Sequence, residues 1–468
     1  MMFKAAPGAS YLNEFVEFVD NSDNSISDLA SLLAQTGVFQ QAIYSNALSN
    51  RDFSVQFIEN SVTTLVNEDD KAWAVSEVER LLDAGASRGE VIYWAATALA
   101  SVDERDLNWG AAARQFNNKV AVAAHYSIDL GAIATSLSVL QRVTEHVTDD
   151  PSSVVTAKLL LESGVTGKVM DGYIKGAQVF ADLNGDQQFN GDEVNAITDA
   201  VGNFSLSAVV GFGDFIASGG IDIATGKPFE GVMMAPAGSS VINPLTTVIS
   251  NIVNNDNLSA QEAAIRVLAS LDLNTEIDLL HFDPIKEIVR TDSHTPANDA
   301  ALAVHAAAIK INTLAGQVAA LLMGAGVTVT EASAITFAYQ AVTDLFANAN
   351  ASIDMASRGI IAQVIQNASL LAGADTPEVL KISALVADAS QTIANLNQRI
   401  TAISESNGSK TKILASMAAV QLVAENIEAA MRAGATKGDI SGTVVSTTGS
   451  LFAGTIRAAG AKIGPRNE

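Results

Sequence analysis

The stretch that decides the interpretation of this chain is DLNGDQQFNGDE, residues 182–193. Counted from the first aspartate, oxygen-bearing side chains fall at positions 1, 3, 5, 7, 9 and 12, which is the ligand register of a twelve-residue calcium loop. Alternate residues of such a loop can point toward one ion. The residue at position 7 offers its backbone carbonyl, and the last carboxylate can bind through both oxygens. The predicted Ca²⁺ ligands are Asp182, Asn184, Asp186, Gln188, Asn190 and Glu193.

The loop departs from the usual pattern at its sixth position. Gln187 stands where a glycine is usual, and Gly185 stands two residues earlier. Either the turn differs, or Gln187 adopts a backbone angle that favours glycine. Few ligands carry charge, so binding is expected to be weak, with a Kd of about 10⁻⁴ to 10⁻³ M. The alternative is a hairpin turn rich in Asn, Asp and Gly that holds no metal. Hard oxygen ligands disfavour zinc and copper.

The segments that flank the loop look like strands rather than the helices of an EF-hand. Residues 176–180 and 198–204 belong to a region, about 163–240, that is rich in β-branched residues, glycines and turn signals. Strand candidates lie at residues 177–181, 203–209 and 215–223. This spacing predicts a small antiparallel β-sandwich that carries the calcium loop.

Helical periodicity dominates on both sides of the strand region. Ser87 with Glu90, and Ser259 with Glu262, form the capping boxes that begin helices. Asn243 before Pro244, and Thr376 before Pro377, are further expected helix starts. Alanine-rich segments that predict a helical bundle lie at residues 297–323, 331–348, 354–372, 377–404 and 410–433.

The predicted fold class is therefore α+β and multidomain. A helical domain covers residues 1–162, the calcium-loop β-sandwich 163–240, and a helical bundle with a Gly/Ser/Thr-rich tail 241–468. The tail, from about residue 442 to 464, has no clear secondary-structure pattern.

Composition restricts the classes of function. The net charge is -24, from 27 basic and 51 acidic residues, which disfavours binding to nucleic acid. The absence of cysteine excludes disulfides and thiolate metal sites. No apolar run approaches about 20 residues, so no membrane span is expected. The first residues lack the apolar segment of a cleaved signal peptide. The chain is then either cytoplasmic or exported with an uncleaved signal.

Motifs that could indicate an enzyme have simpler explanations. Residues 85–89 match G-x-S-x-G, but a helix precedes them, so we interpret Ser87 as a helix cap. The histidines are scattered and should be surface or packed residues; they are His125, His146, His281, His294 and His305. We therefore expect no enzymatic activity.

Two further groups could bind ligands. Asp214 and Asp222 could serve a second cation site, although we expect them to provide solubility at strand edges. Four aromatic residues could stack on sugar rings, although their helical setting favours the core; they are Trp73, Tyr93, Trp94 and Trp109.

Ordered motifs between residues 172 and 284 resemble a known family. They cover residues 172–186, 198–204, 217–222, 235–239, 242–247 and 282–284. Together, over about residues 165–310, they resemble the calcium-loop β-sandwich modules of large bacterial secreted adhesins. Residues 85–91 and 116–120 resemble the small helical modules of surface-layer and type I-secreted proteins. In some surface-layer proteins, similar regions hold the lattice on lipopolysaccharide.

The resemblance implies export by type I secretion and a structural or adhesive role. The chain lacks the glycine-rich RTX nonapeptides that often accompany this export route. We expect a non-enzymatic protein of the bacterial cell surface or extracellular space. It would be a surface-layer, matrix or filament subunit, stabilised by Ca²⁺ and assembled as a homo-oligomer or polymer. The alternative is an adhesin whose N-terminal helical domain binds a glycan or lipopolysaccharide.

Overall fold

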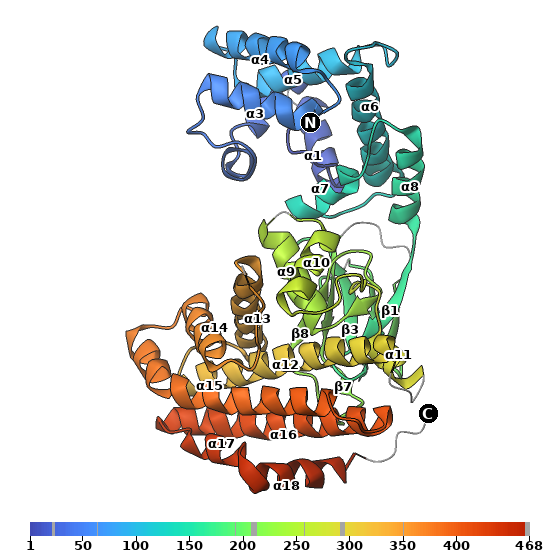
Figure 1. The fold of residues 1–468 in the computed structure, drawn as a ribbon. Coiled ribbons are helices and arrows are strands. Elements are labelled where there is room, and N and C mark those ends of the chain that lie inside the picture. The colour runs from blue at the N-terminus through green and yellow to red at the C-terminus, as the bar shows by residue number, and fades with distance from the viewer. Residues whose placement is uncertain are drawn as a thin grey trace. The chain divides into compact units, whose positions relative to one another are not determined.

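The computed structural model describes residues 1–20, 24–62, 64–191, 193–206, 213–256, 258–290, 295–349 and 351–463. Most of these residues are helical, and short strands between residues 165 and 242 form small sheets, so the fold is α+β (Figure 1). The chain forms two compact units. Unit 1 comprises Met1–Gly164 with Asp182–Gln188, and unit 2 comprises Val165–Ala181, Phe189–Leu206 and the chain from Asp214 onward.

Unit 1 is built from short helices, as its periodicity predicts. Their bounds are α1 (Ala9–Asp20), α2 (Ile26–Leu33), the π-helical turn η1 (Val38–Ile43), α3 (Asn50–Val62), α4 (Glu68–Asp83), α5 (Arg88–Ala100), α6 (Gly110–Ala124), the π-helical turn η2 (His125–Asp129), α7 (Leu137–Glu145) and α8 (Pro151–Glu162).

Aromatic side chains fill the core of unit 1. The ring of Tyr44 packs edge-on against Phe53 at 5.1 Å, and Phe53 stacks on Phe57 at 5.8 Å. The guanidinium of Arg88 lies 4.6 Å above the Phe53 ring and donates a hydrogen bond of 2.8 Å to the Leu48 carbonyl. The aromatic pairs and the cation–π contact tie the start of α5 to the connection before α3.

The helix starts that were predicted from capping patterns are largely confirmed. Ser87 accepts a hydrogen bond from the Glu90 amide, and the Glu90 carboxylate accepts one from Ser87, so the G-x-S-x-G match is a helix cap. Ser259 forms the same capping box at the start of α10. The prediction for α15 is displaced by one residue, because its cap is Asp375 and Thr376 is the first helical residue.

The strand region of unit 2 forms three small sheets. The strands are β1 (Val165–Val169), β2 (Ile174–Lys175), β3 (Gln178–Asp182), β4 (Asn195–Ile197), β5 (Asn203–Leu206), β6 (Asp214–Ser218), β7 (Ile221–Asp222), β8 (Val232–Ala235) and β9 (Val241–Ile242). Their orders are β5-β1-β9, β2-β7 and β4-β3-β6-β8. The β1–β5, β2–β7, β3–β4 and β6–β8 pairs are antiparallel, and the β1–β9 pair is parallel.

One predicted strand is wrong in its extent. Residues 215–223 do not form a continuous strand but divide into β6 and β7, because Gly219 and Gly220 take φ values of 64° and 88° that end the extended run. The predicted strand at 203–209 is observed as β5, and residues 207–209 lie outside the described residues.

The helices of unit 2 follow the strands. They are α9 (Pro244–Asp256), α10 (Ala260–Ser270), α11 (Pro284–Arg290), α12 (Pro296–Ala325), α13 (Glu331–Ala347), α14 (Arg358–Leu371), α15 (Thr376–Ser404), α16 (Lys410–Lys437), α17 (Ser441–Ser446) and α18 (Gly449–Gly460). The five predicted alanine-rich segments correspond to α12 to α16. The tail that the sequence pattern left unassigned contains α17 and α18.

Helix α12 lies at the centre of the helical part of unit 2. It packs against α9, α11, α13, α15 and α16, and α15 and α16 run beside it as long neighbouring helices (Figure 1). The contact with α16 is close, because a Cβ atom added at Gly324 would lie 2.4 Å from the Arg432 carbonyl oxygen. In the described part of the chain, α12 and α16 are long and apolar enough to span a membrane, but most of the most apolar window of each is buried within the protein.

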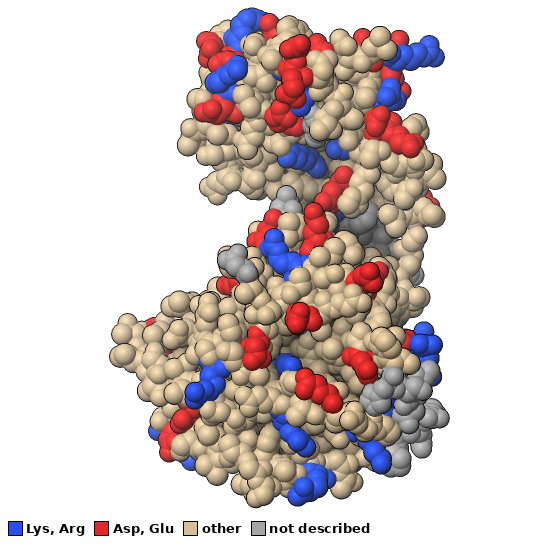
Figure 2. Space-filling model, viewed as in Figure 1, with Lys and Arg blue, Asp and Glu red and all other residues tan. Residues whose placement is uncertain are grey.

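One face of the protein shows how charged side chains are distributed over it. On the face shown in Figure 2, acidic and basic side chains are interspersed among uncharged ones, without a continuous patch of one sign. The large negative net charge is therefore distributed rather than concentrated on this face.

Candidate calcium loop and ligand pockets

The first half of the predicted calcium loop closes around Asp182. This residue ends β3, is only 4% exposed, and accepts hydrogen bonds from the amides of Gly185 (2.7 Å) and Gln187 (3.0 Å). Gln187 has a φ of 58° and Gly185 a φ of 79°. Of the two alternatives for the missing glycine, the structure therefore adopts the second, in which Gln187 itself takes the left-handed conformation.

The other polar side chains in this half of the loop form hydrogen bonds with residues of the same loop. The Asn184 side chain accepts a hydrogen bond from the Asp186 amide (3.0 Å) and donates one to the Asp186 carboxylate (2.9 Å). That carboxylate also accepts from the Gln188 amide (2.8 Å). A carboxylate offers about four acceptor sites, so hydrogen bonds to loop amides are compatible with coordination of a cation.

The second half of the loop forms a separate set of contacts. Glu193 is 5% exposed; its carboxylate accepts from the Asn190 amide (2.9 Å), and its own amide donates to the Asn190 carbonyl (2.9 Å). The ring of Phe189 packs edge-on against Phe180 at 5.7 Å. Asp192, the acidic residue just before Glu193, lies outside the described residues.

The predicted ligands thus fall into two hydrogen-bonded sets. Asp182, Asn184, Asp186 and Gln188 form the first, and Asn190 and Glu193 form the second. Over the described ranges, no group of three or more His, Asp or Glu side chains is arranged to hold a metal by itself. A cation in this loop would therefore depend on amide and carbonyl oxygens as well as carboxylates.

No protein-family model, curated protein or solved structure matches this chain. The likeness to adhesin and surface-layer modules therefore stays a prediction that rests on sequence motifs.

The expectation that Asp214 and Asp222 sit at strand edges for solubility is wrong. Both are buried, with exposed fractions of 7% and 5%. Asp214 accepts hydrogen bonds from Ser250 and Asn254, and Asp222 accepts from the Ala224 amide (2.8 Å). Burial of a carboxylate is tolerated where donors surround it, so both residues serve internal structure.

The described histidines are surface or packed residues, as expected, and His146 is exposed. The Nδ1 atom of His125 lies 2.9 Å from Asp129, and that of His281 lies 2.8 Å from Asp278. His305 is buried in α12. His294 lies outside the described residues.

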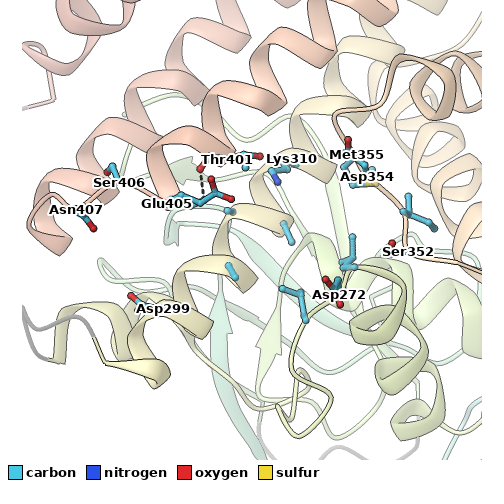
Figure 3. Close-up of a pocket in the computed structure, with 17 residues that line it drawn as sticks. Asp272, Asp299, Lys310, Ser352, Asp354, Met355, Thr401, Glu405, Ser406 and Asn407 are labelled. Atoms are coloured by element: carbon cyan, nitrogen blue, oxygen red, sulfur yellow. Dashed lines mark hydrogen bonds between the residues drawn. The ribbon is translucent and has the colours of Figure 1, made fainter.

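A polar pocket of about 620 Å³ opens within unit 2 (Figure 3). Figure 3 shows Lys310 between Asp354 and Met355 on one side and Thr401 and Glu405 on the other. Burial lowers the pKa of Lys310, while the charges of Asp354 and Glu405 oppose that shift. The pocket lining contains no histidine, so a Ser-His-Asp arrangement is not formed there. The arrangement suits binding of a charged polar group.

Three tryptophans line a smaller pocket of about 250 Å³ in unit 1. The expectation that these residues are core is wrong for Trp73 and Trp94, which are 56% and 40% exposed; Tyr93 nearby in sequence is 37% exposed. Trp109 is partly buried against the core and meets Trp73 edge-on at 6.3 Å. Helical spacing alone could not distinguish a ring that fills the core from one that lines a pocket.

Sequence patterns gave no indication of a group of acidic residues inside unit 2. Asp171 accepts a hydrogen bond from Asn312 (2.6 Å), and burial together with the charges of Asp222 and Glu425 raises its pKa well above the ordinary value. Burial raises the pKa of Glu425 to about 7 and that of Glu428 to about 8. These carboxyl groups therefore tend to hold protons near neutral pH.

We predict that calcium binds the loop with a Kd of about 10⁻⁴ to 10⁻³ M and that Asp182→Asn weakens binding by about tenfold or more. The reason is loss of the buried charge at the first ligand position. Isothermal titration calorimetry of the whole chain measures both. Asp69→Asn, an exposed position in α4, is the matched control and should bind like the unchanged protein. Absence of binding at about 10⁻² M calcium would show that the loop is a metal-free turn.

We also predict that stability falls as pH rises toward 8. The pKa of Glu428 is raised in the folded state, so its contribution is fully present below its unfolded pKa near 4.5 and is lost as pH passes about 8. Glu428→Gln should remove the part of this dependence that comes from Glu428, whereas Asp171 and Glu425 keep theirs. Between about pH 5 and pH 8, the unfolding free energy of this variant should therefore rise relative to that of the unchanged protein by on the order of 2 kcal/mol. Denaturant unfolding measures the difference, and the exposed Glu276→Gln should track the unchanged protein. Parallel pH profiles for Glu428→Gln and the unchanged protein would refute the assignment.

Proposed function

We propose that this chain is a non-enzymatic extracellular structural protein, a subunit of a surface layer, matrix or filament, that is stabilised by calcium and assembles with copies of itself. The observation that carries the proposal is the loop at residues 182–193, whose oxygen-bearing residues follow the calcium register. Its closure around the buried Asp182, with Gln187 in a glycine-like conformation, supports the proposal.

Calcium would act on this protein in two ways. Inside the loop, a cation would compensate the carboxylates at its first and last positions, which are both buried. Between copies, divalent cations would reduce the repulsion expected from a net charge of -24 on each chain. The small strand region that carries the loop would be the calcium-loop β-sandwich predicted from the sequence. The absence of cysteine is consistent with export without oxidative folding.

The proposal predicts calcium-dependent assembly. Purified protein should form ordered arrays or filaments at millimolar calcium and dissociate when a chelator is added, because loop rigidity and charge compensation are both lost. Electron microscopy and sedimentation velocity of the same samples measure this. Asp182→Asn should shift the calcium requirement upward by about tenfold, whereas Asp69→Asn should not. Protein that stays monomeric with and without calcium would contradict self-assembly.

A second candidate function is adhesion to a glycan through unit 1. It is favoured by the exposed rings of Trp73 and Trp94 beside a pocket, because an aromatic face with a polar edge can stack on a sugar ring. This function would coexist with a structural role, since the pocket and the calcium loop use different residues.

The glycan alternative predicts that the protein binds members of a glycan array and that Trp73→Ala and Trp94→Ala each weaken binding about tenfold or more. Leu107→Ala is the matched control, because Leu107 is 99% exposed and does not line the pocket. Thermal unfolding of each variant separates loss of binding from loss of folding. An array without hits would reject this function.

A further inference from the structure

The first two helices of unit 1 bury their apolar faces only in part, although α2 packs closely against α5. Helix α1 has the sequence ASYLNEFVEFVD and α2 the sequence ISDLASLL, yet no residue of either helix is buried. The neighbouring α3, in contrast, buries Phe53 and Phe57 in the aromatic core. An amphipathic helix normally gains its stability by burying its apolar stripe, so these two helices have a stripe that lacks a full partner.

The partly exposed faces of α1 and α2 line a pocket of about 510 Å³, which is within the range of small-molecule sites. Its walls come mainly from the N-terminal segment and from α1, α2, α5, α6 and η2, with smaller contributions from α3 and α7. Most of the lining is aliphatic or small, and includes Leu12, Ile26, Leu29, Leu33, Ile92 and Val120. The pocket is thus continuous with the core of unit 1 but is not filled by it.

Two lysines and no carboxylate line this pocket. Lys4 precedes α1 and has a φ of 54°, and Lys119 lies in α6. Neither forms an ion pair with an acidic residue in the described part of the chain. In a protein with 51 acidic residues, two cations beside an apolar cavity without an acidic partner are unexpected.

The two charges affect each other unfavourably. Burial lowers the pKa of Lys119, and the charge of Lys4 lowers it further, so the two ammonium groups are close enough to repel. Burial also lowers the pKa of Lys4. An anion between or beside them would remove this penalty, because an opposite charge favours the charged form of both amines.

We propose that this pocket binds one fatty acid, with the acyl chain along the apolar faces of α1 and α2 and the carboxylate at Lys4 and Lys119. Charge complementarity selects the anionic head, and the aliphatic walls select a tail that gains free energy by leaving water. The proposal does not depend on calcium binding or on self-assembly.

Dodecanoate is the probe, and isothermal titration calorimetry with the whole chain is the measurement. We expect one molecule bound per chain below the micelle concentration. Dodecanol and dodecyltrimethylammonium, which keep the tail but lack the negative charge, should bind at least about tenfold more weakly. Lys119→Gln and Lys4→Gln should each weaken dodecanoate binding about tenfold, since the tail contacts remain.

Lys286→Gln is the charge-matched control, because Lys286 is exposed and lies in unit 2. Thermal unfolding of each variant shows whether it is folded. Equal loss of binding in the control, or equal affinity for dodecanol and dodecanoate, would overturn the proposal. Binding to vesicles of anionic phospholipid without binding of free dodecanoate would also overturn it, since the lysines would then serve a membrane surface. A change in sedimentation coefficient caused by Lys119→Gln alone would indicate that a second copy fills the pocket.

Discussion

Burial of α12 on nearly all sides is the constraint on which unit 2 depends. The helix can be surrounded because its small side chains let neighbouring helices approach closely, as at Gly324 beside the Arg432 carbonyl. Close packing of this kind leaves little room for water. Polar groups that face the interior from α12 and α16 must therefore bond to each other or be neutral. Gln317 meets this requirement with its amide nitrogen, which donates to the Ala424 carbonyl at 2.8 Å, whereas its buried Oε1 has no hydrogen-bond partner among the described residues. Protonation of Glu428, whose pKa is raised to about 8, meets the requirement in another way.

The requirement that buried polar groups be hydrogen-bonded or neutral also applies to two sets of acidic residues. These are Asp171, Glu425 and Glu428 inside unit 2, and the carboxylates of the loop at residues 182–193. Both place carboxyl groups where water is scarce, but they differ in the donors available. Asp171 lies beside the Asn312 amide side chain and near the acidic residues Asp222 and Glu425. Protonation therefore lowers the free-energy cost of burying its carboxyl group. Asp182 accepts hydrogen bonds from two backbone amides, which fix the position of its carboxylate in the loop. The first arrangement responds to pH, and the second, on our proposal, responds to calcium.

Features set by neighbours in sequence could be predicted, and features set by distant contacts could not. The capping boxes, the five long helices and the unusual angle at Gln187 follow from local chemistry. The burial of Asp214 and Asp222 and the exposure of Trp73 depend on which elements pack together, which periodicity does not determine. Likewise, the lysines beside the apolar pocket of unit 1 come from segments more than a hundred residues apart. Whether the six predicted ligands share one ion stays a prediction.

The most direct test of the account is a crystal structure obtained at millimolar calcium, with anomalous scattering used to identify the ion. The account predicts a calcium peak in the loop at 2.3–2.6 Å from oxygens of Asp182, Asp186 and Glu193, and from the Gln188 carbonyl. A well-ordered loop without such a peak, with the same hydrogen bonds to Asp182, would contradict it and leave the segment as a metal-free turn.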